Sequence, residues 1–95
     1  MPRYQKVVWR HDFPDEPVML YSEIDDEGFE TRKVEIYRDG RHDFADSQRS
    51  TGSTVLSDKA LPSIAEIAMQ SEFVPTEIQR GEFERVWDEA AAAHA

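Results

Sequence analysis

The tetrapeptide Arg-His-Asp-Phe occurs twice in this 95-residue chain, at 10–13 and at 41–44. A histidine beside a carboxylate can ligate a metal ion, or act as a general base that the carboxylate orients. In an up-and-down meander, both copies are expected at the same end of the sheet. If the first four strands are neighbours in sequence order, however, the first and fourth lie about 14 Å apart. One metal ion cannot join ligands so far apart. We therefore predict that His11 and His42 share no site, and that the chain has no catalytic residue, metal or cofactor.

Three acidic residues crowd the segment that holds the first copy. Asp12, Asp15 and Glu16 alternate there with Pro14 and Pro17. One interpretation is an acidic surface for a basic protein, or a weak site for a divalent cation. The other is turn formation alone, because aspartate favours turns by accepting hydrogen bonds from nearby backbone N–H groups. We take these three residues as candidates for partner binding.

Other motifs that carry chemistry are missing. The chain has no cysteine, which excludes disulfides, a thiol nucleophile and a thiolate zinc site. The acidic run at 25–28 lacks the alternating ligand spacing of a calcium loop. The polar segment 47–53 contains one glycine and no following lysine, so it is no phosphate-binding loop.

Charge and hydrophobicity narrow the classes of partner. Twenty acidic residues against 11 Lys and Arg give a formal net charge of −9. This charge disfavours nucleic acid and anionic membranes, which attract Lys and Arg. It suits a basic protein, which opposite charge would steer in. No apolar run approaches the ~20 residues of a membrane span, and the first residues lack the apolar segment of a signal peptide. We expect a cytoplasmic protein.

The elements that position these residues predict one α+β domain over residues 1–95. Alternation of apolar and polar residues predicts an antiparallel meander sheet of four to five strands, at 4–11, 18–24, 29–38 and 42–46, with a short edge strand at 54–56. A short helix begins at Pro62. A C-terminal helix, with Gln79 at its N-cap, carries an apolar stripe of Phe83, Val86, Trp87 and Ala90. We expect this helix to cover one face of the sheet, with Trp87 against Trp9, Leu20 and Val34.

Two turns set the pairing of the strands. A three-residue loop at 26–28 places Gly28 at the left-handed position such hairpins need, and pairs Leu20 with Val34. We predict this loop, because a four-residue loop pairs Leu20 with Lys33 and buries a charge. For the turn at 39–40, the sequence leaves two loop geometries possible. A strict two-residue loop sends Phe44 to the face opposite Val34, and a bulge reverses this.

The chosen register predicts an exposed aromatic face. It places Tyr4, Met19, Tyr21 and Tyr37 opposite the face that the C-terminal helix covers. Such a patch commonly marks an interface, so we take these four residues as candidates for partner binding. Alternatively, the helix that begins at Pro62 covers them.

Several motifs resemble those of a known family. They are Trp-x-His-Asp-x-Pro-Asp-Glu-Pro at 9–17, Tyr-Ser-Glu-Ile-Asp at 21–25, Arg-Lys-Val-Glu-Ile-x-Arg-Asp-Gly-Arg at 32–41 and Glu-Phe-Glu-x-Val-Trp at 82–87. Together they resemble a family of small bacterial proteins catalogued only as a domain of unknown function. The resemblance implies a single α+β domain and implies no activity, cofactor or site residue.

The function that these observations favour is that of a small acidic, non-catalytic protein-binding domain, for example an immunity or antitoxin-type inhibitor of a basic protein. One alternative is a structural or regulatory module that self-associates as a homodimer through the aromatic face. The other is a metal-assisted hydrolase that uses the His-Asp pairs.

Overall fold

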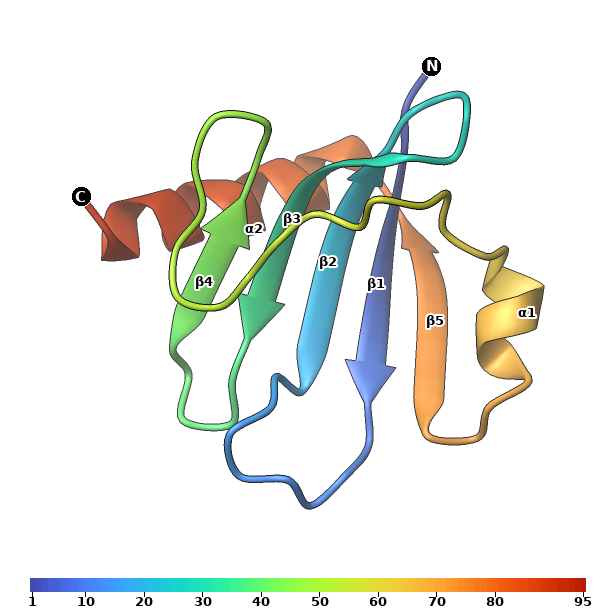
Figure 1. The fold of residues 1–95 in the computed structure, drawn as a ribbon, viewed down its shortest axis with the longest axis horizontal. Coiled ribbons are helices and arrows are strands. Elements are labelled where there is room, and N and C mark those ends of the chain that lie inside the picture. The colour runs from blue at the N-terminus through green and yellow to red at the C-terminus, as the bar shows by residue number, and fades with distance from the viewer.

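The computed structural model describes residues 1–95. It contains one antiparallel sheet of five strands in the order β4-β3-β2-β1-β5, and two helices (Figure 1). The predicted α+β class and the predicted meander of the first four strands are confirmed. Along the chain the elements are β1 (Arg3–Trp9), β2 (Met19–Ile24), β3 (Glu30–Ile36), β4 (His42–Ala45), α1 (Ile64–Ala68), β5 (Phe73–Ile78) and α2 (Arg80–Ala93).

The two faces of the sheet are covered differently. The long helix α2 lies behind the sheet in Figure 1, and the segment 46–63 crosses in front of it before the short helix α1. Four residues of α2 are buried, whereas α1 buries none. The α2 face therefore holds the main core, and the opposite face is only partly filled.

The hairpin between β2 and β3 has the predicted loop but not the predicted register. The Asp25 N–H donates to the Phe29 carbonyl at 2.9 Å, which encloses residues 26–28, and Gly28 has φ +90°. A bulge next to Ile24 then shifts the pairing, so that Val34 lies opposite Tyr21 instead of Leu20. Since side chains alternate along a strand, a one-residue shift moves every side chain of β2 to the other face relative to β3.

The turn after β3 is resolved in favour of a bulge. The Tyr37 N–H donates to the Arg41 carbonyl at 2.9 Å, and Gly40 has φ +89°, so three residues form the loop. Phe44 consequently pairs with Val34 and shares its face.

The core lies between α2 and the face of the sheet that carries Tyr21 and Val34. Its buried residues form one cluster: Tyr4, Tyr21, Val34, Phe44, Phe83, Val86, Trp87 and Ala90. The predicted helix stripe is confirmed in full. The predicted contacts of Trp87 with Trp9 and Leu20 are wrong, because the bulge places both residues on the opposite face. Trp87 instead meets Phe44 edge to face, with ring centroids 5.1 Å apart.

The fifth strand is not the one predicted. Residues 54–56 form no strand, and the Thr54 hydroxyl donates to the Glu35 carboxylate instead. The outer strand is β5, which pairs with β1 and contains Pro75. Proline is acceptable there because an edge strand leaves one side of its backbone unpaired.

The two helices differ in how they begin. Ser63 and Glu66 cap α1 with reciprocal side-chain hydrogen bonds. The N-cap of α2 is Gln79, as predicted, and its side chain makes no capping hydrogen bond.

Neither helix combines the length and apolar character needed to cross a lipid bilayer.

Candidate functional site

The segment that joins β1 to β2 is held firmly at both ends. The Trp9 N–H donates to the Val18 carbonyl at 2.9 Å, and the Val18 N–H donates to the Ile36 carbonyl at 2.8 Å. Inside the segment, His11 Nδ1 accepts from the Phe13 N–H at 3.0 Å and Nε2 lies 2.8 Å from the Pro17 carbonyl. This pattern assigns the ring proton to Nε2. Hydrogen bonds therefore fix the shape of this segment, and both ring nitrogens of His11 take part in them.

Four aromatic rings gather where this segment leaves the sheet, and we call them the aromatic corner: Trp9, His11, Phe13 and Phe73. The Trp9 and His11 centroids are 4.2 Å apart, and His11 stacks on Phe13 at 5.4 Å. The Phe73 ring of β5 lies 5.9 Å from the Trp9 ring, centroid to centroid. The side chain of Phe13 is nonetheless exposed, at 58%. The corner thus offers a large apolar ring to solvent on a rigid support.

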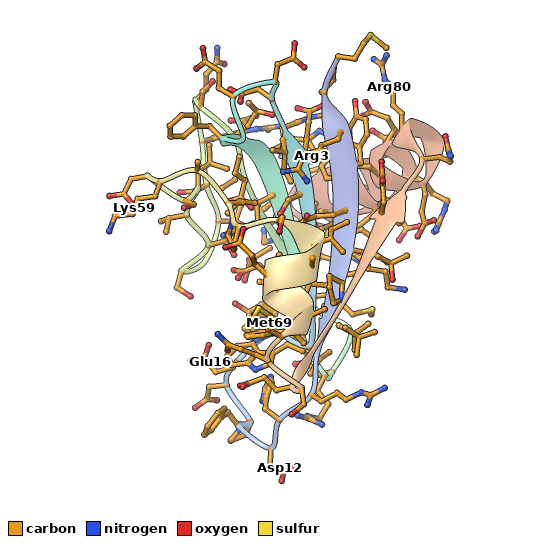
Figure 2. All side chains as sticks on the ribbon, turned by 90° about the vertical axis from the view of Figure 1, so that its right-hand side faces the viewer. Arg3, Asp12, Glu16, Lys59, Met69 and Arg80 are labelled. Carbon is orange, nitrogen blue, oxygen red and sulfur yellow. The ribbon has the colours of Figure 1, made fainter.

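The three acidic candidates lie in the same segment as this ring, and Asp12 and Asp15 line a second depression with Arg38 and Arg41. Asp12, Asp15 and Glu16 are all exposed, and Figure 2 shows Asp12 at the tip of the segment and Glu16 farther back, toward Met69. None of them forms an ion pair, although ten ion pairs exist elsewhere in the chain. A shallow depression joins Asp15 and Glu16 to Phe13. Free carboxylates next to an exposed ring suit contact with a cationic and apolar surface.

The other four candidates do not form an exposed patch. Tyr4 and Tyr21 are 6% and 5% exposed beneath α2, and Met19 packs against the same core. Tyr37 is also buried, with the Arg41 guanidinium 4.2 Å from its ring centroid. The prediction of an exposed aromatic face is therefore wrong. The bulge beside Ile24 turned Tyr4, Met19 and Tyr21 toward the helix, whereas Tyr37 stays on the other face of the sheet.

The two His-Asp pairs remain separate. His11 belongs to the corner after β1, whereas His42 begins β4 at the far edge of the sheet and lies 2.8 Å from the Gly40 carbonyl through Nδ1. The chain contains no group of three or more His, Asp or Glu residues placed to hold a metal ion. Asp43 instead lies 3.3 Å from His94 of the C-terminus, a proximity that the sequence did not reveal.

The strongest charged cluster joins α2 to the sheet. The Arg32 guanidinium donates to both oxygens of Glu23 and to both oxygens of Glu84, at 2.6–2.9 Å. These hydrogen bonds hold the pKa of both carboxyls below the usual range and raise the pKa of the guanidinium. Burial, together with the Glu23 charge, raises the pKa of the Tyr4 phenol. The cluster is structural, since Arg32 also lies 4.9 Å from the Phe83 ring and 5.1 Å from the Trp87 ring.

Sequence reasoning missed the aromatic corner because it assigned Trp9 to the main core. The signal was present, since Trp9, His11 and Phe13 alternate with polar residues as they would on one face of an extended chain. The support from Phe73 was not foreseeable without β5.

Comparison with known proteins places the chain in a family. No curated protein and no solved structure matches it. One family does match, over residues 3–92, which is nearly the whole chain. The chain therefore belongs to the family described as a domain of unknown function (DUF6881).

Proposed function

We propose that this chain is a non-catalytic protein-binding domain, whose partner meets the aromatic corner and its three acidic neighbours. The observation that carries the proposal is Phe13, which is 58% exposed yet stacked on His11 and tied to it by a backbone hydrogen bond. An exposed ring on a rigid support loses little conformational entropy on binding. Such aromatic anchors provide much of the binding energy at protein interfaces.

The charge around the ring indicates the chemistry of the partner. None of Asp12, Asp15 and Glu16 forms an ion pair within the chain, although Arg38 and Arg41 line the same depression as Asp12 and Asp15. The net charge of the chain is −9. A partner that presents lysine or arginine beside an apolar side chain would satisfy both the ring and the carboxylates. An inhibitor of a basic protein, of the immunity or antitoxin type, is the specific form of this proposal.

The two other functions have less support. Self-association was argued from an exposed face of tyrosines, and those residues are buried. A hydrolase was argued from two His-Asp pairs, but one pair lies in the segment after β1 and the other on β4, and each histidine has a ring nitrogen 2.8 Å from a backbone carbonyl.

The first test is capture from a cell lysate with two matched variants. Phe13→Ala removes the exposed ring, and Val55→Ala removes another exposed apolar side chain far along the sequence, 67% exposed. We expect a basic protein that wild type and Val55→Ala retain and Phe13→Ala does not. Binding kinetics on that protein should show dissociation at least tenfold faster for Phe13→Ala, because a central aromatic anchor is typically worth about 2 kcal/mol or more.

The acidic residues should act differently from the ring. Replacing Asp12 and Asp15 by Asn and Glu16 by Gln should slow association and remove most of its dependence on salt, because exposed charges steer encounter over roughly a Debye length of 8–10 Å. Retention of the same proteins by Phe13→Ala, or association that is indifferent to salt, would contradict the proposal. Sedimentation that shows a dimer in wild type and a monomer in Phe13→Ala would favour self-association instead.

A further inference from the structure

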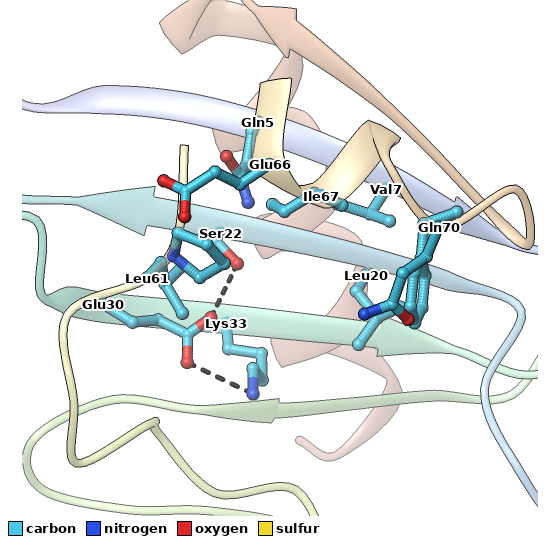
Figure 3. Close-up of a pocket in the computed structure, with 12 residues that line it drawn as sticks. Gln5, Val7, Leu20, Ser22, Glu30, Lys33, Leu61, Glu66, Ile67 and Gln70 are labelled. Carbon is cyan, nitrogen blue, oxygen red and sulfur yellow. Dashed lines mark hydrogen bonds and ion pairs between the residues drawn. The ribbon is translucent and has the colours of Figure 1, made fainter. Parts of the chain in front are cut away.

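A groove on the other face of the sheet has the features of a small-molecule site. It lies between strands β1–β3 on one side and α1 with the segment before it on the other, and its volume is about 440 Å³ (Figure 3). Sites for small ligands typically have volumes of roughly 300–1,000 Å³, apolar walls and a few polar groups. This groove has both kinds of lining.

The apolar walls come from both sides of the groove. They are formed by Val7, Leu20, Leu61, Ile67 and Phe73. Four of these five side chains stay only partly buried, and α1 as a whole buries no residue. The helix therefore stands over the sheet without filling the space beneath it, which leaves apolar surface for an occupant to cover.

The polar end of the groove contains one buried group that lacks a hydrogen-bond partner within the protein. Gln5 is 3% exposed, and its side-chain carbonyl oxygen has no hydrogen-bond partner. An amide that is buried without a hydrogen-bond partner destabilises the folded protein. Rotation about the soft terminal torsion of the side chain can turn either end of the amide toward the groove. Gln5 thus supplies an acceptor and two donors that await a partner.

The neighbouring polar groups, in contrast, are satisfied. Ser22 Oγ donates to Glu30 at 2.6 Å, the Ser57 N–H donates to the same carboxylate at 3.0 Å, and Lys33 Nζ lies 3.2 Å from it. Two of these contacts are drawn in Figure 3. The Glu30 carboxylate thereby neutralises the charge of Lys33. The Lys33 ammonium also donates to the Val55 carbonyl at 3.1 Å. With Glu66 also in the lining, the groove carries one more negative charge than positive.

We infer that this groove binds a small uncharged molecule that has an apolar body and an amide or lactam edge, with Gln5 as the polar anchor. The edge of an amide offers a donor and an acceptor side by side, which complement the acceptor and donor of the glutamine amide. The excess negative charge of the lining disfavours carboxylates and phosphates. This site shares only Phe73 with the aromatic corner, so it stands or falls independently of the proposed protein partner.

The test uses two probes of equal shape, benzamide and benzoate, titrated into the whole protein and followed by NMR. Benzamide should bind with a dissociation constant on the order of millimolar, as such a small ligand allows. Its shifts should centre on Gln5, Leu20 and Ile67. Benzoate should bind at least fivefold more weakly. Equal binding of both probes, benzamide shifts centred elsewhere, or no binding would overturn the inference and leave Gln5 satisfied by water.

Variants separate a binding role of Gln5 from a structural one. Gln5→Leu keeps the approximate volume and removes the amide, so benzamide binding should weaken about fivefold while the melting temperature stays equal or rises, because an unpaired buried group is lost. A fall in melting temperature with unchanged benzamide affinity would show a structural role and contradict the inference. Ile67→Trp should fill the groove and prevent binding. Met69→Trp, at the C-cap of the same helix and at a position 84% exposed, should not prevent binding.

Discussion

Replacing Trp87 by alanine should lower the free energy of unfolding by about 3–5 kcal/mol, which is the usual cost of removing a buried tryptophan. Trp87 is 9% exposed and packs against three groups, each of which would lose this contact in the variant. These are the Phe44 ring at 5.1 Å, the Phe83 ring at 6.3 Å and the Arg32 guanidinium at 5.1 Å. A domain this small has a total stability of roughly 5–10 kcal/mol. The loss should therefore appear as a large drop in the urea midpoint.

The matched control is Asp88→Ala, the next position on α2. Asp88 is exposed and makes no ion pair, so its replacement should change the free energy of unfolding by less than about 0.5 kcal/mol. A loss below about 1 kcal/mol for Trp87→Ala would show that α2 does not pack on Phe44 as described.

The second large effect is expected at Arg32. Replacing it by methionine keeps an apolar side chain over Phe83 but removes the cation that bridges Glu23 and Glu84, and Glu84 then keeps only Arg80, at 3.5 Å. Breaking a fully buried ion pair costs roughly 3–5 kcal/mol. The Glu23 side chain is 16% exposed and the Glu84 side chain 33%, so solvent lowers this cost. We expect about 2–3 kcal/mol, measured by urea unfolding at pH 7.

Two further variants identify the cause of that loss. Adding Glu23→Gln to Arg32→Met should recover about 1 kcal/mol, since it removes the charge that the first change left unpaired. Arg85→Met breaks a surface pair with Glu89 at 3.1 Å, and should cost less than about 0.5 kcal/mol. Equal losses at Arg32 and Arg85 would mean that the cluster contributes no more than an ordinary surface pair.

The same cluster makes a prediction for acid. The pKa values of the Glu23 and Glu84 carboxyls are lowered in the folded protein by hydrogen bonds from Arg32. Their contribution to stability is therefore complete above the unfolded pKa of about 4.3, and is lost as the pH falls through the lower folded values. The stability difference between wild type and Arg32→Met should be largest near pH 7 and shrink below about pH 4. A difference that stays constant from pH 7 to pH 3 would contradict the assignment.

Local chemistry in the sequence determined much of the fold. Alternating apolar residues placed the first four strands, and Gly28 determined a three-residue loop that the structure confirms. The stripe from Phe83 to Ala90 identified the buried side of the last helix. These features depend on residues close in sequence, whose preferences act without help from the rest of the chain.

Tertiary structure decided which face of the sheet became the core. A bulge beside Ile24 shifted the β2–β3 register by one residue, and no residue type in this hairpin predicts that shift. Its cause lies in packing: Tyr21 and Met19 join Val34 and Phe44 beneath α2, where a large aromatic surface is removed from water. The same shift leaves Leu20 in the groove and Trp9 in the aromatic corner, so both candidate sites follow from it.

The outer strand was likewise decided by long-range contact. Every second position from 74 to 78 holds a β-branched residue, Val74, Thr76 or Ile78, which favours a strand. Pro75 argues against a central strand. Only pairing with β1 at the edge of the sheet accommodates both. That pairing brings Phe73 beside Trp9 and sets α1 over the groove. The sequence therefore supplies the residues of both candidate sites. Their proximity depends on contacts between segments more than sixty residues apart, such as Trp9 and Phe73.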